Sequence, residues 1–427
     1  MPYSITRTYS RINSNLEKEV SMSGPLEGYR IVELAGYVAA PAATRVLADL
    51  GAEVIKVEAF SGDPYRTNAP VYHMPNDSDI EDPCFDLVAV NKKFIALNLK
   101  NEKAKEVFNN LLSKSDVLVT NTREQSLERL GYSYSQVKEA FPHLIYAHMV
   151  GYGLKGSKSE TPGYDYTCFA TRGGVTASLY EKGGAPMIPG PAFGDLQASM
   201  VMVAGILAAL INREKTGKGD RVVTSLHGTA VYNMGLLHSA SQFGYIYPIS
   251  RKEAFNPFNN TYKTSDDHWV QLCIPNFNGD FDRVMKAIGR EDLCGDERYC
   301  NISRLCESGL LSEFVSIMDA QLSQRTVDEW RTIFKENDIP YERCLTSLEV
   351  LDDPECWSNG FLRKVTYPTG LECIAVNSPI QMDSMGEPPY RTSRGIGADT
   401  EEILQKLGYS VDEISGFEQE NIALQHE

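Results

Sequence analysis

The chain has 427 residues, of which 42% are hydrophobic and 23% charged, a composition that excludes intrinsic disorder and favours a folded chain with two lobes. Its formal net charge of −16 argues against nucleic acid and anionic membranes as partners, although local lysines and arginines can still hold a small anion. Nine scattered cysteines without a C-x-x-C pair are typical of reduced, cytoplasmic thiols, and we expect no metal site.

The N-terminal segment is polar and lacks the apolar stretch of a signal peptide, so we expect a flexible arm at 1–24. The longest apolar run, Met200 to Ile211, is short for a membrane span. A buried helix is the better interpretation of this run. We therefore expect a cytoplasmic protein without a membrane partner.

Strands alternate with amphipathic helices from Tyr29 onward. Strands are expected at 29–34, 54–58, 94–99, 116–120 and 144–150, with helices between them at 42–50 and 104–112. This order predicts an α/β fold with a doubly wound, mostly parallel sheet. Ligands of such sheets lie beyond the carboxyl ends of the strands, but no G-x-G-x-x-G motif opens the first helix.

The turn K-T-G-K-G-D precedes 221–226, which is expected to be the last strand of the first half. Further elements are expected as a strand at 269–274 and as helices at 280–289, 327–336 and 400–407. The composition becomes richer in Asn, aromatic and acidic residues near 240. We therefore predict a large domain at 25–235, a small α+β domain at 236–345 and a C-terminal segment at 346–427.

Histidines do not suggest a catalytic site, because they are spread thinly and form no spaced metal motif. His227 lies near Ser225, but the G-x-S-x-G motif of a hydrolase is absent.

Asp195 is the strongest candidate for chemistry, because P-A-F-G-D-L-Q-A-S-M places its carboxylate at the head of a long apolar helix. We expect the helix N-terminus to hold this carboxylate ionised. A helix-capping role is the alternative, and we interpret Asp165 in P-G-Y-D-Y-T-C-F as a cap. Lys92 and Lys93 suit either a phosphate contact or an exposed pair.

Four segments in order resemble the class III coenzyme A transferases, and the resemblance runs from Pro25 to the C-terminal helix. They are G-Y-R-I-V-E-L-A-G-Y-V-A-A-P-A-A-T-R-V-L-A-D-L-G-A-E-V-I-K-V-E, N-K-K-F-I-A-L-N-L-K, G-D-L-Q-A-S-M and K-T-G-K-G-D-R-V-V. The stretch P-G-Y-D-Y-T-C-F-A-T-R-G-G-V-T-A-S-L-Y-E-K-G is most similar to the branch that acts on 2-hydroxy acids in amino-acid-fermenting anaerobes.

This resemblance implies roles for particular residues. Asp195 would be the nucleophile. Apart from the resemblance, we expect Tyr37 and Val38 to form part of the wall of the substrate pocket. The implied coenzyme A contacts are Val38, Ala39, Lys92, Asn121, Thr122, Arg123, Arg129 and Tyr152. This chain differs from formyl-CoA transferase at two places. Ala59 stands where formyl-CoA transferase has a basic residue, and N-P-F-N-N occupies the region of that enzyme's glycine-rich lid.

The resemblance also implies a fold and a reaction. The fold would be a Rossmann-like large domain, completed by the C-terminal segment, in an interlocked homodimer with a small domain. No cofactor would be bound permanently, since the coenzyme A thioester is a co-substrate. CoA would pass from an acyl-CoA donor to a carboxylic acid such as (R)-phenyllactate, through an aspartyl anhydride and an aspartyl-CoA thioester.

Two rival functions remain at this point. An acyl-CoA racemase of the same fold would exchange an α-proton, but racemases carry a His where this chain has Tyr164. A non-catalytic CoA-binding module would use Asp195 only as a helix cap.

Overall fold

A computed structural model describes residues 24–75 and 81–425. The arm predicted at 1–24 therefore lies, except for Gly24, outside the described residues.

One large sheet organises the described chain, with strand order β12-β3-β2-β1-β4-β5-β6. Its strands are β1 (Arg30–Leu34), β2 (Glu53–Glu58), β3 (Lys93–Leu97), β4 (Val117–Thr120), β5 (Ile145–Val150), β6 (Arg221–Ser225) and β12 (Ala423–Leu424). β12 pairs antiparallel with β3, and the other neighbours are parallel. The predicted doubly wound parallel sheet is confirmed.

Helices cover both faces of this sheet. Successive residues of a strand point to opposite faces, so each strand contributes side chains to two cores. Ile31 belongs to the core beneath one set of helices, α1 (Ala39–Asp49) and α6 (Phe193–Thr216). Val32 belongs to the opposite core, beneath α3 (Glu102–Ser113), α4 (Glu124–Leu130), α5 (Tyr134–Ala140) and α15 (Thr400–Leu407). Strands with two buried faces explain the near-continuous apolar segments in the sequence.

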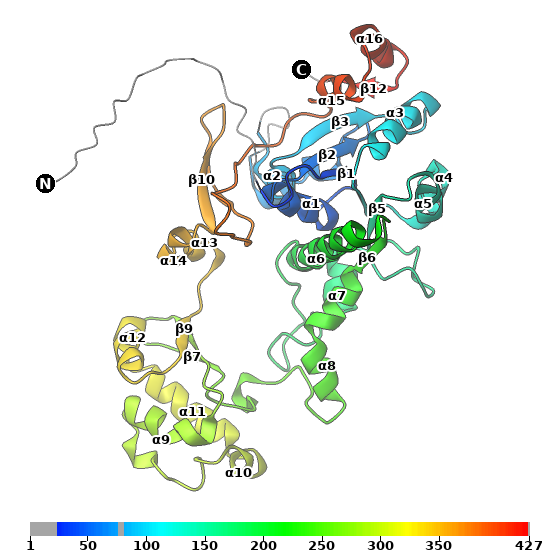
Figure 1. Cartoon of the computed structure of the whole chain (residues 1–427). Helices are drawn as coiled ribbons and strands as arrows, with labels where there is room; N and C mark the ends of the chain where they lie inside the picture. The colour runs from blue at the N-terminus through cyan, green and yellow to red at the C-terminus, as the bar shows by residue number, and fades with distance from the viewer. Residues whose placement is uncertain (1–23, 76–80, 426–427) are drawn as a thin grey trace, which may run out of the picture.

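A smaller lobe lies apart from the sheet in Figure 1. It contains the antiparallel strands β7 (Thr261–Lys263), β8 (Trp269–Leu272) and β9 (Tyr341–Arg343), with helices α9 (Phe277–Ala287), α10 (Ile302–Glu307), α11 (Leu311–Leu322) and α12 (Val327–Glu336). Phe258, Phe281, Phe314 and Trp330 are fully buried in its own core. α7 (Leu226–Asn233) and α8 (Gly235–Ser241) lead toward this lobe, so its core begins later than the predicted boundary at 236.

The C-terminal segment returns to the large lobe, as β12 shows by pairing with β3. On the way it forms α13 (Ser347–Val350), α14 (Pro354–Ser358), the hairpin β10 (Leu362–Thr366) and β11 (Glu372–Val376), and, between α15 and β12, α16 (Val411–Gln419). Arg45 of α1 ties the hairpin down by donating a hydrogen bond to the Val376 carbonyl over 2.7 Å. The hairpin also lies beside α2 (Pro83–Ala89).

By length and composition alone, α6 could also cross a membrane. In the structure, however, its residues Ala198, Met202 and Ile206 are buried against β5 and α1 in the core of the large lobe. This packing explains the apolar run as a core helix.

Candidate active site

A cleft of about 460 Å³ lies at the carboxyl ends of β1, β4 and β5. It is lined by residues of the loops after these strands and by the first turn of α6, including Tyr37, Val38, Ala39, Asn121, Thr122, Arg123, Asp165 and Asp195. A hollow of about 220 Å³ shares Asn121, Thr122 and Arg123 with the cleft and continues toward Arg221. This is the edge of the sheet where doubly wound folds bind ligands.

Hydrogen bonds with Asn121 and Asp63 hold the backbone of the loop after β1. Asn121 accepts a hydrogen bond from the Gly36 N–H over 3.1 Å and donates one to the Gly36 carbonyl over 2.7 Å. The Tyr37 N–H donates to Asp63 Oδ1 over 3.0 Å, and Tyr37 has a left-handed φ of 61°. These bonds hold a strained backbone in place and fix Tyr37 and Val38 at the cleft.

Asp195 lies in the first turn of α6, but it is not the N-cap, which is Ala192. Its carboxylate is half-buried, and among the described residues no group donates a hydrogen bond to it. Burial, together with the negative charge of Asp165, raises its pKa to about 7. This differs from the expectation that the helix N-terminus holds Asp195 ionised, because burial and the charge of Asp165 both disfavour the ionised form.

Asp165 is the first residue of a short π-helix, η3 (Asp165–Thr171). Its Oδ1 accepts a hydrogen bond from the Gly194 N–H over 3.0 Å, while its buried Oδ2 has no hydrogen-bond partner within residues 24–75 and 81–425. Burial raises the pKa of Asp165, and hydrogen bonds from the N–H groups of Gly194 and Asp195 oppose this rise. Asp165 therefore caps α6 rather than its own helix, and it places a second carboxylate beside Asp195.

Gly194 allows this close approach because it has no side chain. A Cβ at this position would lie 2.2 Å from Phe169 Cγ and 2.3 Å from Asp165 Oδ1. Glycine is therefore required where η3 meets the first turn of α6.

Seven of the predicted site residues come together in the cleft. They are Tyr37, Val38, Ala39, Asn121, Thr122, Arg123 and Asp195. Arg129 is exposed on α4 and donates a hydrogen bond over 3.3 Å to Ser126, which lines the cleft. Tyr152 does not line the cleft and instead packs edge-on against His227.

Lys92 requires a correction, because its ammonium group is buried instead of facing the cleft. It forms an ion pair with Glu33 over 2.6 Å and donates to the Pro41 carbonyl over 2.7 Å. Lys56 pairs with the other oxygen of Glu33 over 2.5 Å. Burial lowers the pKa of Lys92 to about 8, while the two lysines overcome burial and lower the pKa of Glu33 to about 2. In this position Lys92 supports the β1 loop and offers no charge to coenzyme A.

The segment N-P-F-N-N forms part of the small lobe. Phe258 is buried in the core of that lobe, and Asn256 donates a hydrogen bond to the Ile274 carbonyl over 3.0 Å. Asn260 donates to the Arg251 carbonyl over 3.0 Å. This anchoring gives the segment a packing role within the small lobe.

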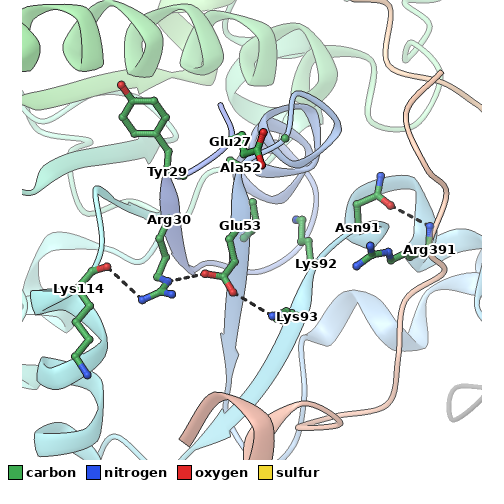
Figure 2. Close-up of a pocket in the computed structure, with 13 residues that line it drawn as sticks. Glu27, Tyr29, Arg30, Ala52, Glu53, Asn91, Lys92, Lys93, Lys114 and Arg391 are labelled. Carbon is green, nitrogen blue, oxygen red and sulfur yellow. Dashed lines mark hydrogen bonds and ion pairs between the residues drawn. The ribbon is translucent and has the colours of Figure 1, made fainter. Parts of the chain in front are cut away.

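A different hollow, of about 520 Å³, lies at the opposite edge of the sheet (Figure 2). Figure 2 shows Glu53, the first residue of β2, between Arg30 of β1 and Lys93 of β3, with ion pairs of 2.6 and 3.0 Å. These charges compensate one another at the amino ends of the strands, away from Asp195. Within the described residues, no cluster of His, Cys, Asp and Glu could hold a metal ion.

Comparisons with known proteins agree on one family. Residues 26–400 match the model for CoA-transferase family III. Cinnamoyl-CoA:phenyllactate CoA-transferase of Clostridium sporogenes is 43% identical over 92% of this chain and 96% of its own. (R)-2-hydroxy-4-methylpentanoate CoA-transferase of Clostridioides difficile is 38% identical over 93% of this chain and 99% of its own. Among solved structures, a CAIB/BAIF family protein from Brucella suis has a TM-score of 0.75 and 25% identity, over 90% of this chain and 99% of its own.

Proposed function

Because the chain belongs to CoA-transferase family III, we propose that it moves coenzyme A from an acyl-CoA to a 2-hydroxy acid with a hydrophobic side chain. The two relatives above are named for acids of this kind, one with a phenyl group and one with a branched alkyl group. The observation that carries the proposal is the Asp195 carboxylate, which lies in the cleft without a hydrogen-bond donor among the described residues.

The first half of the reaction uses Asp195 as a nucleophile. One of its oxygens attacks the thioester carbonyl, the C–S bond breaks, and CoA leaves as a thiolate. The thiolate then attacks the Asp195 carbonyl of the resulting anhydride, so the donor acid leaves as a carboxylate and aspartyl-CoA remains. The acceptor acid repeats the two steps in reverse, which regenerates the Asp195 carboxylate and conserves the thioester.

The first step is uphill, because a carboxylate is a better leaving group than a thiolate by about four pKa units, or roughly 5–6 kcal/mol. A buried carboxylate helps in two ways. Its high pKa makes it more basic than an exposed aspartate, and attack moves its negative charge toward the departing thiolate. A site that disfavours charge on Asp195 therefore favours anhydride formation.

We expect coenzyme A to bind in the cleft beside Asp195. Arg123 is exposed where the cleft and the adjoining hollow meet, and its guanidinium is a suitable partner for a phosphate group. Asn121 and Thr122 lie beside it at the end of β4. We assign no permanently bound cofactor, since the thioester itself brings the reactive group.

A homodimer is part of the proposal. α6, α7, α8 and the turn after α8 expose large apolar side chains, including Tyr232, Leu236 and Phe243, which are 83%, 86% and 90% exposed. Exposed apolar surfaces of this kind commonly mark protein interfaces. We expect a second copy of the chain to cover them.

A cytoplasmic location and a role in amino-acid fermentation complete the proposal, and the nine free cysteines suit a reducing compartment.

The test compares Asp195→Ala with the unchanged chain in a CoA-transfer assay from cinnamoyl-CoA to phenyllactate. We expect transfer to be lost and acyl-CoA binding to be kept. Asp412→Ala is the matched control, because Asp412 also lies in the first turn of a helix, α16, but outside the cleft. Transfer at the normal rate by Asp195→Ala would refute the proposal.

A further inference from the structure

A separate apolar hollow of about 290 Å³ lies on the other side of the first turn of α6. Ala192, the N-cap of α6, lines this hollow, while Asp195 lines the cleft described above. Val38 also lines the cleft and packs in one apolar cluster with Tyr65, Cys84 and Ala192, which line the hollow. The cleft and the hollow are therefore lined in part by residues of the same apolar cluster.

The walls of the hollow come from distant parts of the chain. Tyr72 belongs to the short helix η2 (Ala69–Tyr72), Met74 follows it, and Ile374 and Val376 belong to β11. All four side chains are at least one-third exposed, although they are large and apolar. Large apolar side chains gathered around one concave site are typical of a binding pocket.

The hollow is electrostatically close to the reacting carboxylate. Burial raises the pKa of the Tyr72 hydroxyl, and the charge of Asp195 contributes to the rise. Arg45 also lines the hollow, but its guanidinium is occupied by the carbonyls of Leu87 and Val376 at 2.8 and 2.7 Å. Arg45 thus joins α2 to β11 and closes one wall, which leaves an apolar surface for the occupant.

We propose that this hollow holds the hydrocarbon side chain of the acid while its carboxyl group meets Asp195. The inference rests on the proposed CoA transfer and assigns its acid specificity to Tyr72, Met74, Ile374 and Val376. A small acid such as lactate would leave the hollow empty. An aryl or branched alkyl group would fill it and gain the free energy of removing apolar surface from water.

The test is an internal competition between phenyllactate and lactate for one enzyme sample with one acyl-CoA donor. Both acids compete for the same CoA-loaded enzyme. The rate at which the donor loads the enzyme is common to both products, so the ratio of the two CoA products depends only on acid selectivity. Val376→Trp fills the hollow from β11, and Met74→Trp fills it from the segment after η2. Each should lower the ratio of phenyllactyl-CoA to lactyl-CoA at least about tenfold, as loss of apolar contacts in a specificity pocket does.

Val411→Trp is the matched control, because Val411 is an exposed valine of α16 that lines neither the hollow nor the cleft. It should keep the selectivity ratio of the unchanged chain. The inference is overturned if the variants at Val376 and Met74 transfer CoA to lactate and keep that ratio. The proposed function fails separately if the unchanged chain forms no CoA ester from any hydroxy acid.

Discussion

Asp165 accepts a hydrogen bond from the backbone N–H of Gly194 over 3.0 Å, although the two residues are 29 positions apart in the chain. This bond ties η3 to the first turn of α6. It places two carboxylates, one with a buried and unpaired oxygen, at the same end of the cleft. The electrostatic environment of Asp195 therefore depends on a residue outside its own helix.

Asp165→Asn should shift the pH dependence of CoA transfer. The amide oxygen can still accept from Gly194, but the negative charge that helps to raise the pKa of Asp195 is removed. Burial alone then raises the pKa of Asp195. The increase of kcat/KM with pH, which follows ionisation of Asp195, should therefore occur about one pH unit lower. The measurement is a profile of kcat/KM against pH for both proteins. An unmoved limb, with activity retained, would exclude the charge coupling.

Asp195→Asn should stabilise the fold in a pH-dependent manner. The folded pKa of about 7 lies above the ordinary value of 3.8, so the folded chain binds a proton that the unfolded chain has released between these values. Stability from this group is thus lost as pH rises through about 7. Because Asn cannot ionise, the variant should gain about 1 kcal/mol more at pH 8 than at pH 5, after allowance for solvent screening. Urea denaturation at both pH values measures the difference, and an equal gain at both would contradict it.

Gly194→Ala should abolish most activity through geometry alone. Its Cβ would collide with Phe169 and Asp165, so the first turn of α6 must shift and move Asp195. A displacement of about 1 Å at a nucleophile typically costs about a hundredfold in rate. The control is Gly190→Ala, because in the described part of the chain no atom beyond the two neighbouring residues lies within 4 Å of a Cβ at Gly190. The measurement is kcat for both variants. A normal kcat in Gly194→Ala would show that the close packing of Gly194 against Phe169 and Asp165 is unimportant for activity.

Lys92→Met should destabilise the protein. The substitution leaves one oxygen of the buried Glu33 without its charged partner, and breaking such a pair costs about 3 kcal/mol. Lys93→Met is the control, because Lys93 pairs with Glu53 and Glu402 near the surface and should cost less than about 1 kcal/mol. Denaturation curves and the KM for acyl-CoA are measured together. A raised KM without loss of stability would return Lys92 to the coenzyme A site.

The sequence pattern predicts the sheet well because its central strands have two buried faces and a helix such as α3 has one. Ile31 and Val32 point to opposite cores, which produces the apolar run of β1, while α3 shows its single buried face at Ala104, Val107 and Phe108. Asp195 could also be singled out, since a carboxylate directly after glycine and before a long apolar helix is a local pattern.

What escapes sequence reasoning here depends on contacts between distant residues. The segment P-G-Y-D-Y-T-C-F predicts that Asp165 is a helix cap, but the N–H group that it caps belongs to Gly194, 29 residues away. Lys92 and Lys93 look alike in the sequence, yet one ammonium group is buried against Glu33 and the other lies near the surface. The apolar hollow combines η2 with β11, which no local pattern connects.

The most direct test of the central claim is the mass of the peptide that contains Asp195, taken from enzyme quenched during turnover with cinnamoyl-CoA and phenyllactate. We predict a covalent adduct at Asp195, seen as aspartyl-CoA or as the product of trapping it with hydroxylamine. The adduct should be absent when acyl-CoA is omitted. An enzyme that turns over while Asp195 stays unmodified would contradict the account.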